Sequence, residues 1–202
     1  MLFSDTYLTI ESTSNIIFKD KGSKFLAYIY PVETEQQIKE YLGNLKKEHP
    51  TANHHCYAYV IGPDKQTLRA NDDGEPSYTA GKPILGQIQS HDLTNVLIVV
   101  VRYFGGTLLG VSGLIQAYKT SALEAIKNSK IIEKQIEFKY VITFPYIHLN
   151  DAMKLLKQLN CHIHDQQFDS DCEINFSIRK SQSEMCEEKL KKIAGLQLTA
   201  IY

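Results

Sequence analysis

The sequence predicts an α+β protein of two domains, and three observations support this prediction. The chain has 202 residues, of which 43% are apolar and 22% charged, a composition typical of a folded chain that can bury one large or two small cores. Stretches rich in β-branched and aromatic residues alternate with segments in which apolar residues recur at helical spacing. The pattern changes between Lys130 and Gln135, so we expect one domain over residues 1–132 and another over residues 133–202.

Three strands rich in β-branched and aromatic residues are expected to open the first domain. They are Tyr7–Glu11, Ile16–Lys19 and Lys24–Val32. Thr34 and Gln37 have the spacing of a capping box, so a helix is expected to begin after Thr34 and to end before Pro50.

The rest of the first domain is expected to surround one buried strand. The aliphatic run Asn95–Val101 is typical of a strand that is buried on both faces. Pro83 suits the first position of a short helix, and a longer helix is expected to begin near Val111. Two strands precede these helices, His54–Ile61 and Gln66–Ala70.

The second domain has the element order β-α-β-β-α-β, which predicts a ferredoxin-like fold. Asn150 is the expected cap of its first helix, and Ser181 with Glu184 forms a capping box for its second helix. The expected strands are Phe138–Phe144, Cys161–Phe168, Cys172–Arg179 and Leu196–Ile201.

Charge and hydropathy exclude several classes of protein. The 22 basic and 23 acidic residues give a net charge of -1, so any binding to nucleic acid needs a local basic patch. The longest aliphatic run, Val96–Val101, is far shorter than the ~20 residues that span a bilayer. The first ten residues lack the basic and apolar regions of a secretory signal, so they are not expected to be one. No membrane partner is expected.

The four cysteines are scattered, which favours buried thiols in a reducing cytoplasm. Cys161 is close to His162 and His164 in sequence, but on a strand it would point away from both histidines. We therefore expect neither a bound metal nor another cofactor.

Two segments have a composition that packing alone does not require, Asn71–Pro83 and Arg102–Gly113. Both lie at the ends of predicted elements, where binding residues concentrate. The first is not a P-loop, because Pro83 stands where the magnesium-binding hydroxyl would be. In the second, the glycine spacing differs from that of a dinucleotide-binding fingerprint.

The second segment is a candidate site for an anion or a phosphate backbone. Glycines allow close approach of a ligand, and the helix that follows presents unpaired N–H groups. The candidate residues in this segment are Arg102, Tyr103, Gly105, Gly106, Thr107, Gly110, Ser112 and Gly113. Lys24, Arg69 and Lys82 would extend the surface to bind RNA. Alternatively, the glycines only form a tight turn, and the basic side chains are solvated or paired with the acidic residues of the first segment.

Asp72, Asp73 and Glu75, together with His54 or His55, are candidate catalytic residues or ligands of a hard cation. General acid–base chemistry uses these residue types when they lie close together. The alternative is a turn in which the carboxylates accept hydrogen bonds from the backbone N–H groups that follow them.

Several blocks of the sequence resemble the IMPACT/YigZ family over most of residues 15–128. They are Lys21–Phe25, His55–Tyr59, Asp72–Ser77, Thr79–Leu85, Leu93–Val96 and Arg102–Gly106, followed by Leu109-Gly110 and Gly113-Leu114. The resemblance implies that the first domain is similar to the second domain of ribosomal protein S5. The second domain is similar to the small ferredoxin-like domain of bacterial YigZ-type members. This domain order is also similar to that of the last two domains of the translocating elongation factor.

The chain departs from the family pattern at Tyr78, at Val111-Ser112 and at Gln116, which stands where a basic residue is common. Taken together, the residues and the resemblance predict a non-enzymatic, cytoplasmic regulator linked to translation or stress. It would bind RNA, the ribosome or a regulatory protein through the two segments. The alternatives are a hydrolase or phosphate-handling enzyme that uses the candidate catalytic residues, and a sensor of small anions at Gly105–Gly113.

Overall fold

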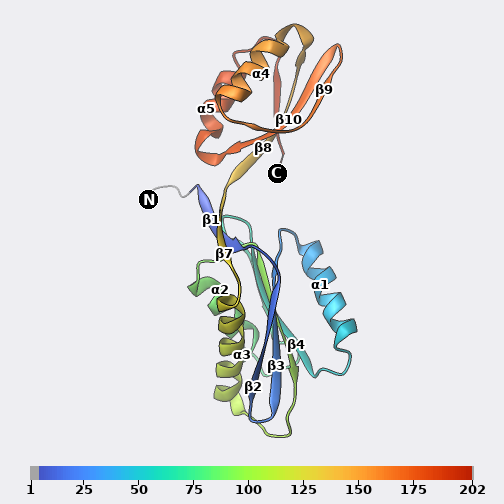
Figure 1. The fold of residues 1–202 in the computed structure, drawn as a ribbon, viewed down its shortest axis with the longest axis vertical. Helices are drawn as coiled ribbons and strands as arrows, with labels where there is room; N and C mark the ends of the chain where they lie inside the picture. The colour runs from blue at the N-terminus through green and yellow to red at the C-terminus, as the bar shows by residue number, and fades with distance from the viewer. Residues whose placement is uncertain (1–4, 202) are drawn as a thin grey trace. The chain divides into compact units, whose positions relative to one another are not determined.

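The computed structural model describes residues 5–201 (Figure 1). Contacts divide the chain into two units after Lys134. The N-terminal unit is Tyr7–Lys134, and the C-terminal unit comprises residues 135–201 with Asp5 and Thr6. Strands β1 (Thr6–Ile10) and β7 (Ile131–Gln135) form a two-stranded sheet of their own.

The N-terminal unit contains a five-stranded sheet in the order β2-β3-β6-β4-β5, in which all neighbours are antiparallel. Its strands are β2 (Ser14–Asp20), β3 (Ser23–Pro31), β4 (His54–Ile61), β5 (Thr67–Asn71) and β6 (Val96–Tyr103). The aliphatic run that predicts a fully buried strand forms the first part of β6, where Val96 to Val101 are completely buried. This central strand has no polar face because helices cover both sides of the sheet.

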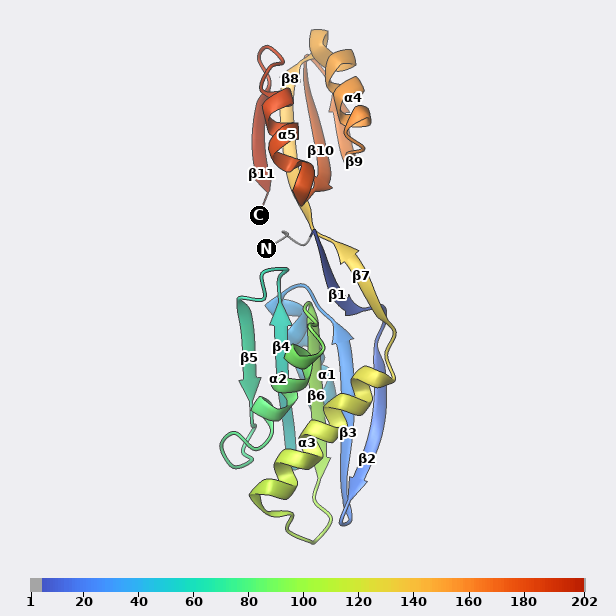
Figure 2. The same ribbon diagram turned by 90° about the vertical axis from the view of Figure 1, so that its left-hand side faces the viewer.

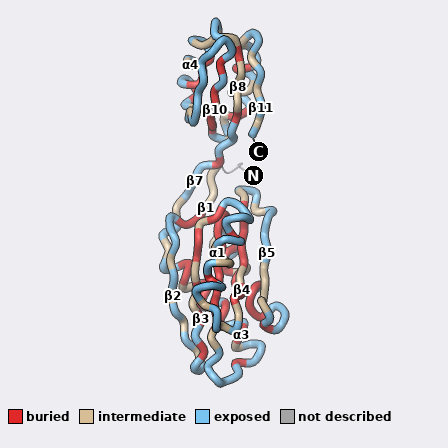
Figure 3. The backbone as a smooth tube through the Cα atoms, turned by 90° about the vertical axis from the view of Figure 1, so that its right-hand side faces the viewer, coloured by how far each residue is buried: buried red, intermediate tan, exposed pale blue. Residues whose placement is uncertain are grey.

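Helices α2 (Gly81–Ser90) and α3 (Gly110–Lys127) pack on one face of this sheet, and α1 (Glu35–Glu48) packs on the other (Figures 1 and 2). The main core lies on the side of α2 and α3, where Phe25 contacts Tyr118. A single helix on the opposite side lies over the buried strands (Figure 3). Tyr28 and Tyr103 on that second face are only partly buried.

The C-terminal unit has a four-stranded sheet in the order β11-β8-β10-β9, with its helices packed on one face (Figure 2). Its elements are β8 (Glu137–Pro145), a short 3-10 turn (Tyr146–His148), α4 (Leu149–Gln158), β9 (His162–Phe168), β10 (Asp171–Arg179), α5 (Lys180–Leu190) and β11 (Gln197–Ile201). Alternate residues of β8 and β10 fill the core beneath the helices. The fold of the described chain is therefore α+β.

The structure confirms one predicted helix cap and contradicts three helix starts. Thr34 and Gln37 form the predicted capping box of α1. Helix α2 begins at Gly81 and not at Pro83, and α4 begins before Asn150, which caps nothing. Ser181 lies inside α5, and its N–H and hydroxyl donate to the carboxylate of Asp5 at 2.9 and 2.6 Å.

No helix among residues 5–201 has the length and apolar character needed to cross a bilayer. The four cysteines are free thiols. The side chains of the described residues form no cluster of three or more metal-ligating groups.

Candidate functional site

Asp72 closes the turn-rich segment Asn71–Gly81 onto the start of α2. One carboxylate oxygen accepts hydrogen bonds from the backbone N–H of Ala80 and Gly81 at 3.0 and 2.8 Å, and the other accepts one from Tyr78 at 2.9 Å. These donors include N–H groups that a helix start leaves without partners. The negative charge of Asp72 also interacts favourably with the positive end of the helix dipole. Asp72 therefore caps α2, as the turn alternative predicts for this carboxylate.

Asp73 holds the start of β4 in place. Its carboxylate accepts a hydrogen bond from the backbone N–H of His55 at 2.7 Å, and its carbonyl oxygen lies 2.9 Å from Nδ1 of His54. His55 is buried, and its Nε2 has no hydrogen-bond partner within residues 5–201. Burial lowers the pKa of His55, although the nearby Asp73 carboxylate acts in the opposite direction.

Glu75 and Arg102 form a buried ion pair between the two segments. Nη1 of Arg102 lies 2.5 Å from Oε1 of Glu75, and the Tyr118 hydroxyl donates to the same oxygen at 2.7 Å. The thiol of Cys56 donates to the Tyr118 hydroxyl at 3.3 Å. Burial raises the pKa of both Tyr118 and Cys56, so both groups stay protonated at neutral pH.

This ion pair brings the two segments together, but it removes Arg102 from the surface. Arg102 is 5% exposed and Glu75 is 8% exposed. The guanidinium carbon also lies over the rings of Phe25 and Phe104, at 5.5 and 5.7 Å from their centroids. Arg102 therefore supports the core and the Phe104 ring. Its charge is balanced by Glu75, as the salt-bridge alternative predicts.

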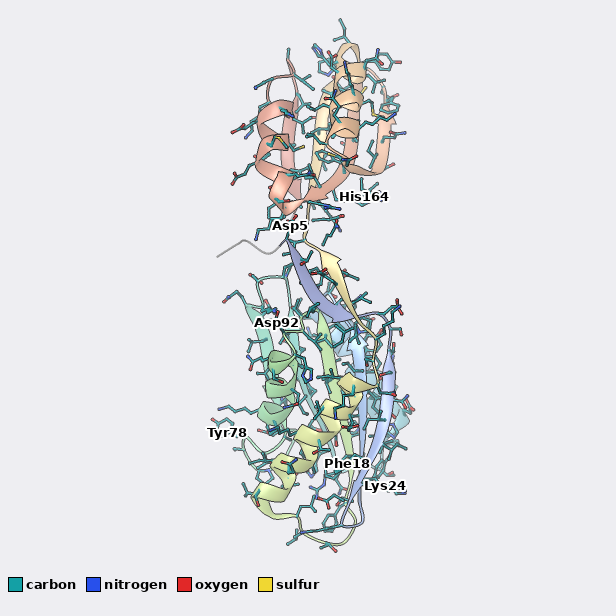
Figure 4. All side chains as sticks on the ribbon, turned by 60° about the vertical axis from the view of Figure 1, so that its left-hand side comes forward. Asp5, Phe18, Lys24, Tyr78, Asp92 and His164 are labelled. Atoms are coloured by element: carbon teal, nitrogen blue, oxygen red, sulfur yellow. The ribbon has the colours of Figure 1, made fainter. Side chains whose placement is uncertain are left out.

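Lys24 lies near the end of the β2–β3 hairpin (Figure 4). Its strand partner Tyr103 belongs to the opposite face of the sheet from Arg102. Lys24 is directly opposite Tyr103 on β6 and Lys19 on β2, so the three side chains share a face. They line a groove of about 460 Å³, which we call the Lys24 groove. Its lining is Ile17, Lys19, Gly22, Lys24, Leu26, His49, Tyr103 and Phe104.

The aromatic wall of the Lys24 groove is held in place by hydrogen bonds. His49 lies between two tyrosine hydroxyls, with Nε2 2.7 Å from that of Tyr28 and Nδ1 3.0 Å from that of Tyr103. Phe104 is 46% exposed. Neither Lys19 nor Lys24 forms an ion pair with a residue of the described chain. The groove thus joins two unpaired positive charges to exposed aromatic surface.

The glycine-rich loop packs against the β2–β3 hairpin. A Cβ atom on Gly105 would lie 1.9 Å from the carbonyl carbon of Gly22, so only glycine fits there. Gly106 and Gly110 have positive φ angles of 84° and 71°, and α3 begins at Gly110 without a side-chain cap. The remaining loop candidates Thr107, Ser112 and Gly113 lie beside these residues, and both hydroxyl side chains are exposed. The close approach that glycine allows at Gly105 is therefore used by the backbone of Gly22 and not by a ligand.

Arg69 and Lys82 do not line the Lys24 groove. Arg69 lies on edge strand β5 opposite Tyr59, separated from β3 by β4 and β6. Lys82 lies at the start of α2, with its Nζ 3.8 Å from the centroid of the Tyr78 ring. The candidate basic residues are therefore spread over both faces of the sheet.

Sequence reasoning missed Lys19, His49 and Phe104 as lining residues of the groove. They come from β2, the end of α1 and the start of the glycine-rich loop, and no spacing in the sequence links them. Phe104 belongs to the Arg102–Gly106 block and follows the candidate residue Tyr103 directly. This position is the one feature of the sequence that could have indicated Phe104 as a site residue.

Fold and site together define a two-unit α+β protein whose N-terminal unit carries a basic and aromatic groove. The family model described as the Impact N-terminal domain matches residues 21–126. IMPACT family member YigZ of Escherichia coli (strain K12) is 30% identical over 201 residues, which cover 98% of each chain. The chain belongs to the IMPACT family, and the resemblance predicted from the sequence is confirmed.

Other relatives differ in how much of their length is matched. IMPACT family member YvyE of Bacillus subtilis (strain 168) is 39% identical over 131 residues, which cover 65% of this chain and 60% of that protein. A crystal structure of a hypothetical protein is 29% identical and matches with a TM-score of 0.76, over 99% of both chains. The similarity thus extends over both units of the chain.

Proposed function

We propose that this protein is a non-enzymatic regulator, linked to translation or stress, that binds single-stranded RNA in the Lys24 groove. The regulatory role is the one that the family resemblance implies. The choice of RNA over a protein partner rests on the chemistry of the groove.

The observation that carries this proposal is the presence of unpaired lysines beside partly exposed aromatic rings. Lys19 and Lys24 line the same groove as Tyr103 and Phe104. Unpaired bases stack on aromatic side chains, and lysine ammonium groups neutralise the phosphates between them. Because His49 holds the hydroxyl of Tyr103, this ring loses little freedom when a base stacks on it.

Binding of a labelled, unstructured RNA oligonucleotide to the full chain, measured by fluorescence anisotropy, tests the proposal. Phe104→Ala is expected to weaken binding by about 1–3 kcal/mol, because one stacking surface is lost. Phe138→Ala is the matched control, since Phe138 is also a partly exposed phenylalanine, at 42%, but belongs to the C-terminal unit. Lys24→Ala should weaken binding, whereas Lys39→Ala on exposed α1 should not.

Two results would contradict the proposal. The first is the absence of measurable binding at low salt. The second is equal affinity for the single strand and its duplex, because paired bases cannot stack on Tyr103 and Phe104. Thermal unfolding of each variant shows whether a loss of binding reflects a loss of structure.

In the hydrolase alternative, His54 is the remaining candidate for general acid–base catalysis. Its Nε2 lies 3.8 Å from Oε1 of Glu75, and 23% of its side chain is exposed. Asp72 and Asp73 accept backbone hydrogen bonds, so a catalytic role for either would compete with its structural one. A substrate screen with and without Mg²⁺ or Mn²⁺ tests this alternative, and turnover that His54→Gln abolishes without unfolding the protein would favour it over RNA binding.

We also infer that the N-terminal unit has the fold of the second domain of ribosomal protein S5, and that the C-terminal unit is ferredoxin-like. The order β8-α4-β9-β10-α5-β11 supports the second assignment. A cytoplasmic location is part of the same proposal, and the four free thiols support it.

A further inference from the structure

The C-terminal unit contains a polar pocket that the proposed RNA binding does not use. Its volume is about 300 Å³, near the lower end for small-molecule sites. The polar side chains that line it include Glu137, Asn160, His162, Ser177, Arg179 and Gln182, all from the C-terminal unit.

A buried serine orients the carboxylate in this pocket. Ser177 is fully buried, and its hydroxyl donates to Oε2 of Glu137 at 2.6 Å. Nε2 of His164 lies 3.0 Å from the same hydroxyl oxygen (His164 is labelled in Figure 4). The single hydroxyl proton of Ser177 is used in the hydrogen bond to Glu137. Nε2 of His164 must therefore be protonated and act as the hydrogen-bond donor to the hydroxyl oxygen of Ser177. This chain of hydrogen bonds leaves the second oxygen of Glu137 without a partner in residues 5–201.

Arg179 adds an unpaired positive charge to the pocket. It lies directly opposite Glu137 in the pairing of β8 and β10, so the two side chains emerge on one face of the sheet. No ion pair joins them, and Arg179 forms none with another residue of the described chain. The pocket is therefore lined by a guanidinium and a carboxylate from one face of the sheet that form no ion pair with each other.

We propose that this pocket binds a small zwitterion, namely a free α-amino acid. The ligand's carboxylate would receive paired hydrogen bonds from Arg179, and its ammonium group would donate to the open oxygen of Glu137. Asn160 and Gln182 would remain for hydrogen bonds to the ligand's side chain. A ligand with only one charge would pair with either the guanidinium or the carboxylate but not with both, so it is expected to bind more weakly than the zwitterion.

Calorimetric titration of the full chain with a panel of free amino acids tests this inference. At least one amino acid is expected to bind and to raise the melting temperature. Its N-acetyl derivative and its amide each lack one charge. The affinity for each derivative is expected to be lower by a factor on the order of ten or more. If no amino acid binds, or if either derivative binds as well as the parent, the proposal is wrong.

Two charge-removing variants show whether the pocket is the site. Arg179→Gln and Glu137→Gln should each reduce affinity for the amino acid on the order of tenfold or more. Arg69→Gln and Glu173→Gln are matched controls, because both residues are exposed on strands and neither lines the pocket. Unchanged affinity in either pocket variant would overturn the proposal. RNA binding in the N-terminal unit is scored separately, so either proposal can fail without the other.

Discussion

At the scale of single residues, Arg102 and Tyr103 have different roles because consecutive side chains of a strand point to opposite faces. Arg102 faces α2 and α3, where it pairs with Glu75. Tyr103 faces the α1 side and lines the Lys24 groove. Two adjacent residues that the sequence assigns to one binding surface thus belong to a buried ion pair and to an exposed groove.

Glu75→Gln is expected to lower the free energy of unfolding by about 3–5 kcal/mol, because it leaves the Arg102 charge buried without a counterion. Urea denaturation followed by circular dichroism measures this change. Glu124→Gln is the control, since Glu124 pairs with Lys127 on the surface of α3 and should change stability by at most about 0.5 kcal/mol. Similar small effects of both variants would show that Glu75 does not stabilise Arg102.

The free energy of unfolding is expected to fall as the pH drops through about 6.5, the pKa of an unfolded histidine, because of His55. Burial lowers the pKa of His55 in the folded protein, so the unfolded chain takes up the proton first as the pH falls. The contribution is therefore present above the unfolded pKa of about 6.5 and is lost as the pH falls through the folded pKa.

His55→Gln should flatten this part of the pH profile in urea denaturation. His91→Gln should leave the profile as it is, because His91 lies partly exposed at the end of α2. A profile that is equally steep in the His55 variant would assign the pH dependence to other groups.

At the scale of elements, α2 depends on a carboxylate that lies outside the helix. Asp72→Ala removes the acceptor for three backbone N–H groups and is expected to cost about 2 kcal/mol. The loss should appear as faster hydrogen exchange of the first turn of α2. Thr34→Ala removes an exposed cap of α1 and should cost about 1 kcal/mol without affecting α2. Unaltered exchange in α2 would contradict the capping role of Asp72.

Local patterns predict the elements better than their ends. The run Asn95–Val101 and the capping box of Thr34 depend on neighbours in sequence. The capping box is found as predicted, and the run predicts a strand that extends from Val96 to Tyr103. Ser181 has the right spacing for a cap, but it bonds instead to Asp5, a partner 176 residues away. Asn150 fails as a cap because α4 begins one residue earlier. Starts that depend on distant partners are not visible in a local pattern.

The Lys24 groove could be predicted only in part for the same reason. Lys24 and Tyr103 are candidates on residue type, but their placement opposite each other depends on the pairing of β3 with β6. The same pairing of strands places Arg102 opposite Phe25, on the face of the sheet that α2 and α3 cover, and this accounts for the burial of Arg102. Strand register over such separations is a property of the folded sheet.

At the scale of the whole molecule, the nearly balanced charge limits how RNA can be attracted. The chain carries 22 basic and 23 acidic residues, so its net field does not draw a polyanion from a distance. Any electrostatic contribution must therefore come from the few unpaired cations at the groove. This distinguishes the proposed site from a broad basic surface, which would show a strong dependence on salt.

The salt dependence of RNA affinity is expected to be shallow for this reason. If Lys19 and Lys24 are the two lysines that contact phosphates, the logarithm of the binding constant should fall with the logarithm of salt concentration with a slope of about -1.4. Replacing both by alanine should bring the slope close to zero while leaving the binding that stacking on Phe104 provides. Titrations between about 50 and 200 mM salt measure both slopes. A slope steeper than about -4, or one that the double variant leaves unchanged, would locate the phosphate contacts elsewhere on the molecule.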